Sequence, residues 1–315
     1  MKILVVGAGA IGGYFGGRLL EASCNVTFLV RPKRAAQLAE TGLVIKSRFG
    51  NVTFKAPPTV QAPELHRPFD LVLLSCKAYD LDSAIDSFAA AVGPDTTILP
   101  LLNGMRHLDV LEERFGAAGV LGGQCLIAAT LDERGSILHL NDSHLLTFGE
   151  RDGKCSPRID AIAQEIRRAD FESRASSVIL LEMWEKWVFF ATLAGITCFM
   201  RSAIGDIAAA GGARLALDLL EECRSIAASA GFAPRAESLE RTRSTVTAPG
   251  SPLTASMLRD IETGAPIEAD HVLGDLVRRG NRALSVDRSL LRLAYMHLKA
   301  YESRRNREKA TTERA

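Results

Sequence analysis

Residues 2–12 read Lys-Ile-Leu-Val-Val-Gly-Ala-Gly-Ala-Ile-Gly, and this stretch decides the fold. An apolar run ends in Gly7, Gly9 and Gly12, which fit the pattern G-x-G-x-x-G, and a helical pattern follows at once. The first glycine permits a tight turn, the second lets a pyrophosphate approach the backbone, and the third allows close packing of helix on strand. The sequence therefore predicts a dinucleotide site at a helix N-terminus, the alternative being a glycine-rich turn without a ligand. The predicted cofactor-binding residues of this turn are Gly7, Ala8, Gly9, Ala10, Ile11 and Gly12.

The end of the second predicted strand, 26–30, lacks the acidic residue that holds the ribose hydroxyls in NAD enzymes. Arg31 stands there instead, and Lys33 and Arg34 follow closely. The planar guanidinium of Arg31 can clamp a 2′-phosphate, and Lys33 or Arg34 would add positive charge. We therefore expect NADPH rather than NADH as the cofactor, and the alternative is a solvated basic loop.

Short apolar runs alternate with helical, Ala-rich segments over residues 1–150, which is the rhythm of a doubly wound parallel sheet. Two further runs, 137–140 and 145–148, flank a polar segment and predict a hairpin that closes the sheet edge. From residue 178 onward the sequence predicts helices, including a buried one over 188–200. The predicted strands of the main sheet are 3–6, 26–30, 71–76, 97–101 and 120–122.

The expected fold class is α/β, with an N-terminal Rossmann-like doubly wound sheet followed by an all-helical C-terminal domain. We expect residues 1–172 to form the NADP-binding domain and residues 173–315 to form the substrate-binding and catalytic domain. From about Arg304 the chain is rich in charge and lacks an apolar stripe, so a frayed or disordered tail is expected.

Composition places the chain among ordinary globular proteins, with 47% hydrophobic and 24% charged residues. Because 38 Lys and Arg balance 37 Asp and Glu, no overall field would recruit nucleic acid or an anionic membrane, and a small-molecule partner is expected. The 6 cysteines form no C-x-x-C pair and are expected to be reduced. The first residues lack a signal-peptide pattern, and the longest apolar stretch is shorter than the roughly 20 residues of a membrane span. A cytoplasmic location is therefore expected.

The histidines and cysteines lack metal-ligand spacing, so no metal is expected, and hydride transfer needs a group that protonates the carbonyl oxygen. Lys186 stands among bulky apolar residues, where its amine would be desolvated, although a snorkelling surface lysine fits the sequence equally well. Asn103 follows a predicted strand at the sheet edge where ligands bind, the alternative being a plain turn. Ser256 and Glu268 lie in the helical half, where a helix cap and a solvated face are the alternatives.

Together and in this order, these residues resemble the ketopantoate reductase (2-dehydropantoate 2-reductase) family over nearly the whole chain. The resemblance implies NADPH-dependent reduction of a 2-oxo acid to a 2-hydroxy acid, with ketopantoate to pantoate, a step of pantothenate biosynthesis, as the default. It implies Lys186 as the general acid, Asn103, Ser256 and Glu268 as substrate-binding residues, and Lys77 and Asn103 as further cofactor contacts. The segments that carry the resemblance are 2–13, Arg31, 75–79, 103–105, 122–123, 184–186 and 256–268.

The sequence departs from this family where members that act on ketopantoate carry asparagines after the catalytic lysine. Phe190, Ala194 and Ile204 stand at those places here. Loss of hydrogen-bonding groups removes discrimination for a hydroxylated substrate, so the same chemistry on a more apolar 2-oxo acid is one alternative. A non-catalytic NADPH-binding sensor is another, and the helical half is compatible with a homodimer.

Overall fold

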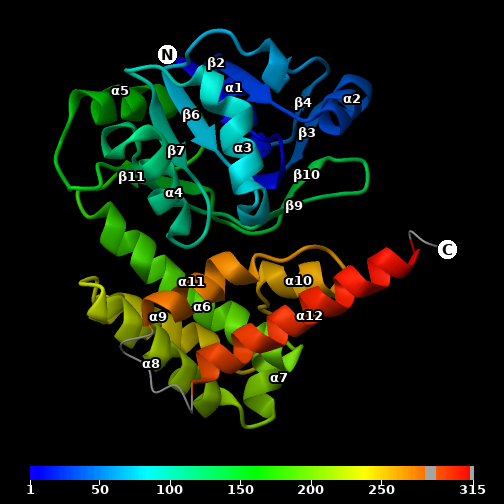
Figure 1. The fold of residues 1–315 in the computed structure, drawn as a ribbon, viewed down its shortest axis with the longest axis vertical. Helices are drawn as coiled ribbons and strands as arrows, with labels where there is room; N and C mark the ends of the chain where they lie inside the picture. Colours follow the sequence, from blue (N-terminus) through cyan, green and yellow to red (C-terminus); the bar gives the residue numbers. More distant parts are fainter. Residues whose placement is uncertain (281–288, 313–315) are drawn as a thin grey trace. The chain divides into compact units, whose positions relative to one another are not determined.

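The computed structural model describes residues 1–280 and 289–312. The chain divides into two compact units: unit 1 is Met1–Leu102 with His107–Ile179, and unit 2 is Asn103–Arg106 with Leu180–Ala315. In Figure 1, unit 1 carries the labelled strands and unit 2 carries helices α6 to α12. The predicted α/β class, a Rossmann-like sheet followed by a helical region, is confirmed.

The main sheet of unit 1 has five parallel strands in the order β5-β2-β1-β6-β7. All four residues of β6 are buried, because helices cover parallel sheets on both faces. The predicted strand 120–122 does not join this sheet, since Val120 makes only an isolated bridge to Ile98. The strands are β5 (Thr59–Val60), β2 (Asn25–Leu29), β1 (Lys2–Val6), β6 (Leu71–Leu74) and β7 (Thr97–Pro100).

Two smaller sheets complete the strands of unit 1, in the orders β4-β3-β10-β9 and β12-β11-β8. The predicted hairpin of 137–140 with 145–148 is wrong, because β10 pairs with β3 and β9 while β11 pairs with β8 and β12. Between them, the Asn141 side chain accepts a hydrogen bond from the Ala128 backbone N–H at 2.8 Å, which joins the segment to β9. The strands are β3 (Leu43–Lys46), β4 (Val52–Phe54), β8 (Gly122–Leu126), β9 (Ala129–Leu131), β10 (Ile137–His139), β11 (Leu145–Gly149) and β12 (Ser173–Ala175).

The β12 pairing also affects the domain boundary. Residues 173–179, expected in the second domain, belong to unit 1 because β12 lies parallel to β11.

Helix α1 (Ala10–Glu21) packs closely on the strands because its inward face carries glycines. A Cβ at Gly16 would lie 2.6 Å from Phe28 Cε1, and one at Gly17 would lie 2.6 Å from Ile45 Cδ1. The close packing fixes the direction in which the helix N-terminus points. The other helices of unit 1 are α2 (Pro32–Thr41), α3 (Leu81–Phe88), α4 (Arg106–Phe115, whose first residue is counted with unit 2) and α5 (Pro157–Ile166).

Unit 2 is organised around the 22-residue helix α6 (Ile179–Met200), which contains the predicted buried helix 188–200. Trp184, Trp187 and Ala191 are all almost completely buried, as expected of a helix that neighbours cover on most sides. Over the described part of the chain, no helix is both long and apolar enough to cross a membrane. The other helical elements are α7 (Ile204–Ala209), α8 (Ala213–Ser229), α9 (Ala236–Val246), α10 (Ser256–Glu262), a π-helical turn (Asp270–Gly274), α11 (Asp275–Arg279) and α12 (Leu290–Thr312).

The C-terminal segment differs from the prediction. Helix α12 continues through Arg304 to Thr312, where a frayed or disordered tail was expected. Charged residues such as Arg and Glu are good helix formers, and Arg304 pairs with Glu308 one turn later at 3.7 Å. Residues 313–315 lie outside the described part.

Candidate active site

The glycine-rich turn has the geometry of a dinucleotide site. Gly7 has φ of +92°, a conformation that favours glycine, and its N–H bonds to the Leu29 carbonyl at 3.0 Å. A Cβ at Gly12 would lie 2.0 Å from Ser75 Oγ and 2.2 Å from the Gly7 carbonyl oxygen, so only glycine fits there. A Cβ at Gly9 would meet no atom within 4 Å, and Gly9 caps helix α1. The backbone is therefore accessible at the place where a pyrophosphate would approach a helix N-terminus.

Ser75 is a residue of this turn whose role the sequence reasoning missed. Its hydroxyl lies 2.9 Å from the Val6 carbonyl oxygen, to which it donates, and 3.2 Å from the Gly7 carbonyl oxygen. The contact ties the end of β6 to the glycine-rich turn. A small polar residue directly after a fully buried strand was the available signal.

Arg31 lies at the N-cap of α2, next to the end of β2. One of its terminal nitrogens is 2.9 Å from Asp80 Oδ1 and 3.2 Å from Ser83 Oγ, while 59% of its side chain remains exposed. The guanidinium is thus oriented by α3 and its N-cap residue Asp80, and its remaining N–H groups are exposed to solvent or a ligand. The nearby Lys77 is exposed and caps the short turn after β6.

Arg34, expected as one possible source of charge for a 2′-phosphate, is hydrogen-bonded to two backbone carbonyls. Its Nε donates to the Ala8 carbonyl at 2.9 Å, and a terminal nitrogen donates to the Gly135 carbonyl at 3.0 Å. Burial lowers the pKa of Arg34 from its ordinary value. The side chain links α2 to the glycine-rich turn and to the β9–β10 connection, which leaves the exposed Lys33 as the second basic residue.

In unit 2, Lys186 is partly buried on helix α6 between two buried neighbours, Glu185 and Trp187. Glu185 accepts hydrogen bonds from the Arg235 backbone N–H and Nε, both at 2.8 Å, and from a terminal guanidinium nitrogen. Burial would raise the pKa of Glu185, but these bonds outweigh it and the pKa lies below its ordinary value. Glu185 is therefore an anion at neutral pH that fixes α6 to the segment before α9.

Two hydrogen bonds connect α6 to the segments that carry the other predicted site residues. Trp187 Nε1 donates to the Val272 carbonyl at 2.8 Å, four residues after Glu268. At the other end, the Ala255 N–H donates to Thr197 Oγ1 at 3.3 Å, directly before Ser256. Lys186, Ser256 and Glu268 therefore belong to one hydrogen-bonded framework, and each is only partly buried.

The sequence left a helix cap as the alternative for Ser256 and a plain turn as the alternative for Asn103. Ser256 is the first residue of α10 rather than its cap, since Ala255 is the N-cap. Asn103 lies in a turn, as the alternative had it, but this turn clusters with unit 2 and packs on the π-helical segment through Gly104. The structure thus brings Asn103, Lys186, Ser256 and Glu268 into unit 2, while the glycine-rich turn, Arg31 and Lys77 are in unit 1.

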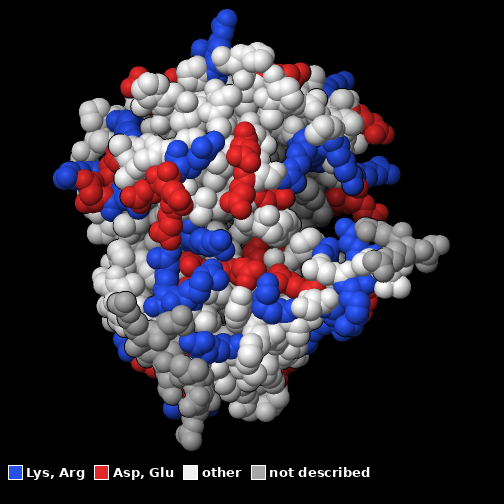
Figure 2. All heavy atoms as spheres, in the orientation of Figure 1, with Lys and Arg blue, Asp and Glu red and all other residues white. Residues whose placement is uncertain are grey.

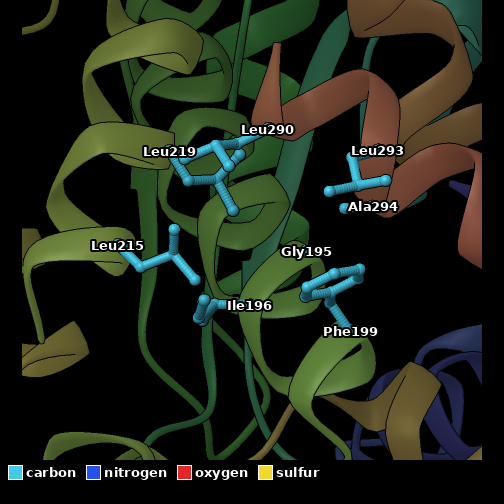
Figure 3. Close-up of a pocket in the computed structure, with 8 residues that line it drawn as sticks. All are labelled: Gly195, Ile196, Phe199, Leu215, Leu219, Leu290, Leu293 and Ala294. Carbon is cyan, nitrogen blue, oxygen red and sulfur yellow. The ribbon is translucent and has the colours of Figure 1, made fainter. Parts of the chain in front are cut away.

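A small apolar pocket in unit 2 lies apart from these residues. Its lining side chains come from α6, α8 and α12 and surround a common space (Figure 3). None of them is polar, and none is a predicted site residue, so the pocket offers no group that could orient a 2-oxo acid. The lining residues are Gly195, Ile196, Phe199, Leu215, Leu219, Leu290, Leu293 and Ala294.

The charged side chains are distributed without a dominant sign. On the face shown in Figure 2, positive and negative groups are interspersed, in line with the formal net charge of +1. Because positive and negative side chains alternate on this face, we do not expect it to produce the strong positive potential that attracts a polyanion such as nucleic acid.

A parallel sheet with this glycine-rich turn, followed by helices that carry a partly buried lysine, is the architecture of a dinucleotide-dependent oxidoreductase. Two family models match the chain: "Ketopantoate reductase PanE/ApbA" over residues 3–153 and "Ketopantoate reductase PanE/ApbA C terminal" over residues 178–302. The chain belongs to the ketopantoate reductase family. Members of this family are NADP-dependent oxidoreductases that act on CH–OH groups and bind NAD(P)H, and the chain is an enzyme of this kind.

The relatives cover almost the full length of the chain. "Uncharacterized oxidoreductase YkpB" of Bacillus subtilis is 39% identical over 304 residues, which are 96% of this chain and 99% of the relative. A "2-dehydropantoate 2-reductase" of Archaeoglobus fulgidus is 27% identical and covers 93% of this chain and 96% of its own. The crystal structure of 2-dehydropantoate 2-reductase from Geobacter metallireducens superposes with a TM-score of 0.85 at 26% identity, covering 95% of this chain and 99% of the other.

Proposed function

We propose that the chain uses NADPH to reduce a 2-oxo acid to the 2-hydroxy acid, with ketopantoate as the substrate and pantoate as the product. The observation that supports the proposal is the pair of hydrogen bonds that Trp187 and Thr197 of α6, the helix of Lys186, make with the segments that follow Glu268 and precede Ser256. The names of the relatives from A. fulgidus and G. metallireducens support the substrate. A reaction in pantothenate biosynthesis and a soluble small-molecule substrate follow from this proposal.

The residues of the site divide the chemistry between them. NADPH, when bound at the glycine-rich turn, would supply the hydride that C2 of the oxo acid receives. The Lys186 side chain donates a proton to the carbonyl oxygen, on which negative charge develops. Asn103 contributes an amide to orient the substrate. The Glu268 carboxylate can accept hydrogen bonds and would repel the substrate carboxylate, so it suits a substrate hydroxyl, such as that of ketopantoate. Ser256 would contribute a hydroxyl that can donate or accept a hydrogen bond.

Turnover with a panel of 2-oxo acids at fixed NADPH tests this function directly. Ketopantoate should be reduced with a stoichiometric loss of NADPH absorbance, and pantoate should be the product. Binding of NADPH without oxidation by any member of the panel would favour the NADPH-binding sensor.

Cofactor preference gives a prediction about Arg31. Arg31→Ala should weaken NADPH binding by about 1.5–3 kcal/mol, because a charged hydrogen-bonding partner of the 2′-phosphate is lost, and should leave NADH binding unchanged. Dissociation constants for both cofactors measure the effect. Lys55→Ala, which removes another exposed positive charge from unit 1, is the matched control. An equal loss for both cofactors would contradict the assignment of Arg31.

A more apolar 2-oxo acid is the second candidate substrate, and Phe190 is the observation that favours it. Phe190 lies one helical turn after Lys186 and is partly buried, so its ring can contact a ligand, whereas Ala194 and Ile204 are completely buried. Of the three positions where relatives that act on ketopantoate carry asparagine, only that of Phe190 therefore has a side chain exposed enough to contact a substrate.

Substrate discrimination should depend on Phe190 accordingly. Phe190→Asn should raise the specificity constant for ketopantoate relative to its analogue with methyl in place of hydroxymethyl by about tenfold, because it adds a hydrogen-bonding partner for the hydroxyl. Ala194→Asn is the contrasting variant: it buries an amide in the core and should chiefly lower stability. A wild-type preference for ketopantoate of about a hundredfold or more would show that other residues read the hydroxyl and would remove the second candidate.

A further inference from the structure

His271 is a buried polar side chain that the proposed chemistry does not use. It is 5% exposed and lies in the π-helical turn Asp270–Gly274, three residues after Glu268. Burial of an imidazole in an apolar core costs free energy unless the ring is hydrogen-bonded. Single π-helical turns occur frequently at functional sites.

The first contact is with the Asn103–Gly104 turn, which belongs to the same unit. The backbone of Asn103 is a hydrogen-bond partner of the His271 ring and acts to raise the pKa of the ring, as a carbonyl that accepts from a ring N–H would do. Gly104 has φ of +77°, and a Cβ there would lie 3.1 Å from His271 Cδ2 and 3.0 Å from the His271 carbonyl oxygen. The turn therefore rests directly on the histidine.

The second contact is with the backbone of Glu268. The Glu268 carbonyl accepts hydrogen bonds from the N–H groups of His271 and Val272, at 3.2 and 2.9 Å. The Val272 carbonyl in turn accepts from Trp187 Nε1, next to Lys186. One π-helical turn thus touches the segments of three predicted site residues, Asn103, Glu268 and Lys186.

The charge state of the ring suits a fixed structural donor. Burial lowers the pKa of His271 and outweighs Glu268 and Asp275, which act in the opposite direction, while Arg106 lowers it further. The imidazole is therefore neutral at neutral pH. A neutral imidazole has one ring N–H, which can donate to the Asn103 carbonyl.

We propose that His271 is a positioning residue, which holds the Asn103 turn in register with Glu268 so that the two side chains meet the substrate in a fixed arrangement. The proposal rests on the proposed function in one respect, the binding of substrate by Asn103 and Glu268. Its physical basis is that an error of about 1 Å in the placement of a binding group can lower the rate about a hundredfold.

The test compares two replacements of this histidine. His271→Phe keeps a buried ring and removes the N–H donor, whereas His271→Gln keeps an N–H donor of similar reach. We expect kcat/KM for the oxo acid to fall about tenfold or more in the Phe variant and to return to within about threefold of wild type in the Gln variant. The dissociation constant of NADPH should stay unchanged in both. His297→Phe, at a partly buried histidine of α12 that stacks edge-to-face on Phe199, is the matched control.

Hydrogen exchange of the protein without ligands supplies a readout that does not depend on turnover. The amides of residues 104–106 should exchange faster in His271→Phe than in wild type, His271→Gln or His297→Phe. Equal exchange in all four proteins, or equal loss of kcat/KM in the Phe and Gln variants, would overturn the proposal for His271. A third outcome is that the wild-type protein reduces no 2-oxo acid while the amides still exchange faster in His271→Phe. That outcome would support the structural role of His271 and would reject only the proposed function.

Discussion

Lys186→Ala should lower turnover at least about a hundredfold, which corresponds to about 2.7 kcal/mol of transition-state stabilisation. The side chain is the proposed source of the proton and of the positive charge that stabilises the developing alkoxide. Helix α6 should not move in this variant, because the Glu185–Arg235 bonds and the Trp187–Val272 bond hold it on both sides of the lysine. Steady-state kinetics with saturating NADPH measure the loss, and the NADPH dissociation constant should be unchanged.

The control for this experiment is Lys309→Ala, which removes an exposed lysine from α12 of the same unit. Its turnover should match that of wild type. Turnover close to wild type in Lys186→Ala would show that Lys186 is a snorkelling lysine on the helix surface, as the sequence alone allowed.

Alanine substitutions at Gly12 and Gly9 should separate stability from cofactor binding. Gly12→Ala places a methyl group 2.0 Å from Ser75 Oγ and 2.2 Å from the Gly7 carbonyl oxygen, so the turn must shift. The free energy of unfolding should therefore fall by about 3 kcal/mol. A Cβ at Gly9 meets no atom within 4 Å, so Gly9→Ala should lower the free energy of unfolding by no more than about 1 kcal/mol, the cost of a poorer N-cap. Its methyl group lies at the proposed approach of the pyrophosphate and should weaken NADPH binding at least about tenfold.

Denaturant unfolding and cofactor titration of the two variants provide the comparison. Gly119→Ala is the control, because a Cβ there would meet only the Thr96 carbonyl, at an ordinary 3.8 Å. If Gly9→Ala bound NADPH as tightly as wild type, the cofactor would not approach the backbone at this glycine.

The parts of the fold that the sequence predicted are those that local pattern determines. The glycine-rich turn is one continuous segment whose φ values and close contacts act over a few residues, and the parallel strands are continuous apolar runs. The predicted hairpin of 137–140 with 145–148 is wrong because an apolar run identifies a strand but not the strand with which it pairs. The β10 strand pairs with β3, which lies far away in sequence, and no local signal records that choice.

Residue type limits the chemistry of a candidate such as Lys186, whose role as general acid stays a prediction. The sequence does not predict a role that depends on tertiary contacts. Arg34 was expected as one possible source of positive charge near a 2′-phosphate, and its bonds to the Ala8 and Gly135 carbonyls could not be read from the sequence. Ser75 and His271 had no assigned function, because their partners are the backbone of residues at least sixty-eight positions away.

The membership of Asn103–Arg106 in unit 2 has a consequence for dissection of the protein. The polypeptide passes between the units three times, at 102/103, 106/107 and 179/180, rather than once at a linker. A fragment that stops at Ile179 would contain the Asn103 turn without the histidine on which it rests, and a fragment that begins at Leu180 would contain the histidine without the turn. Cutting the chain at 179/180 would therefore leave two incomplete halves, and complementation between separately expressed halves would have to rebuild this contact.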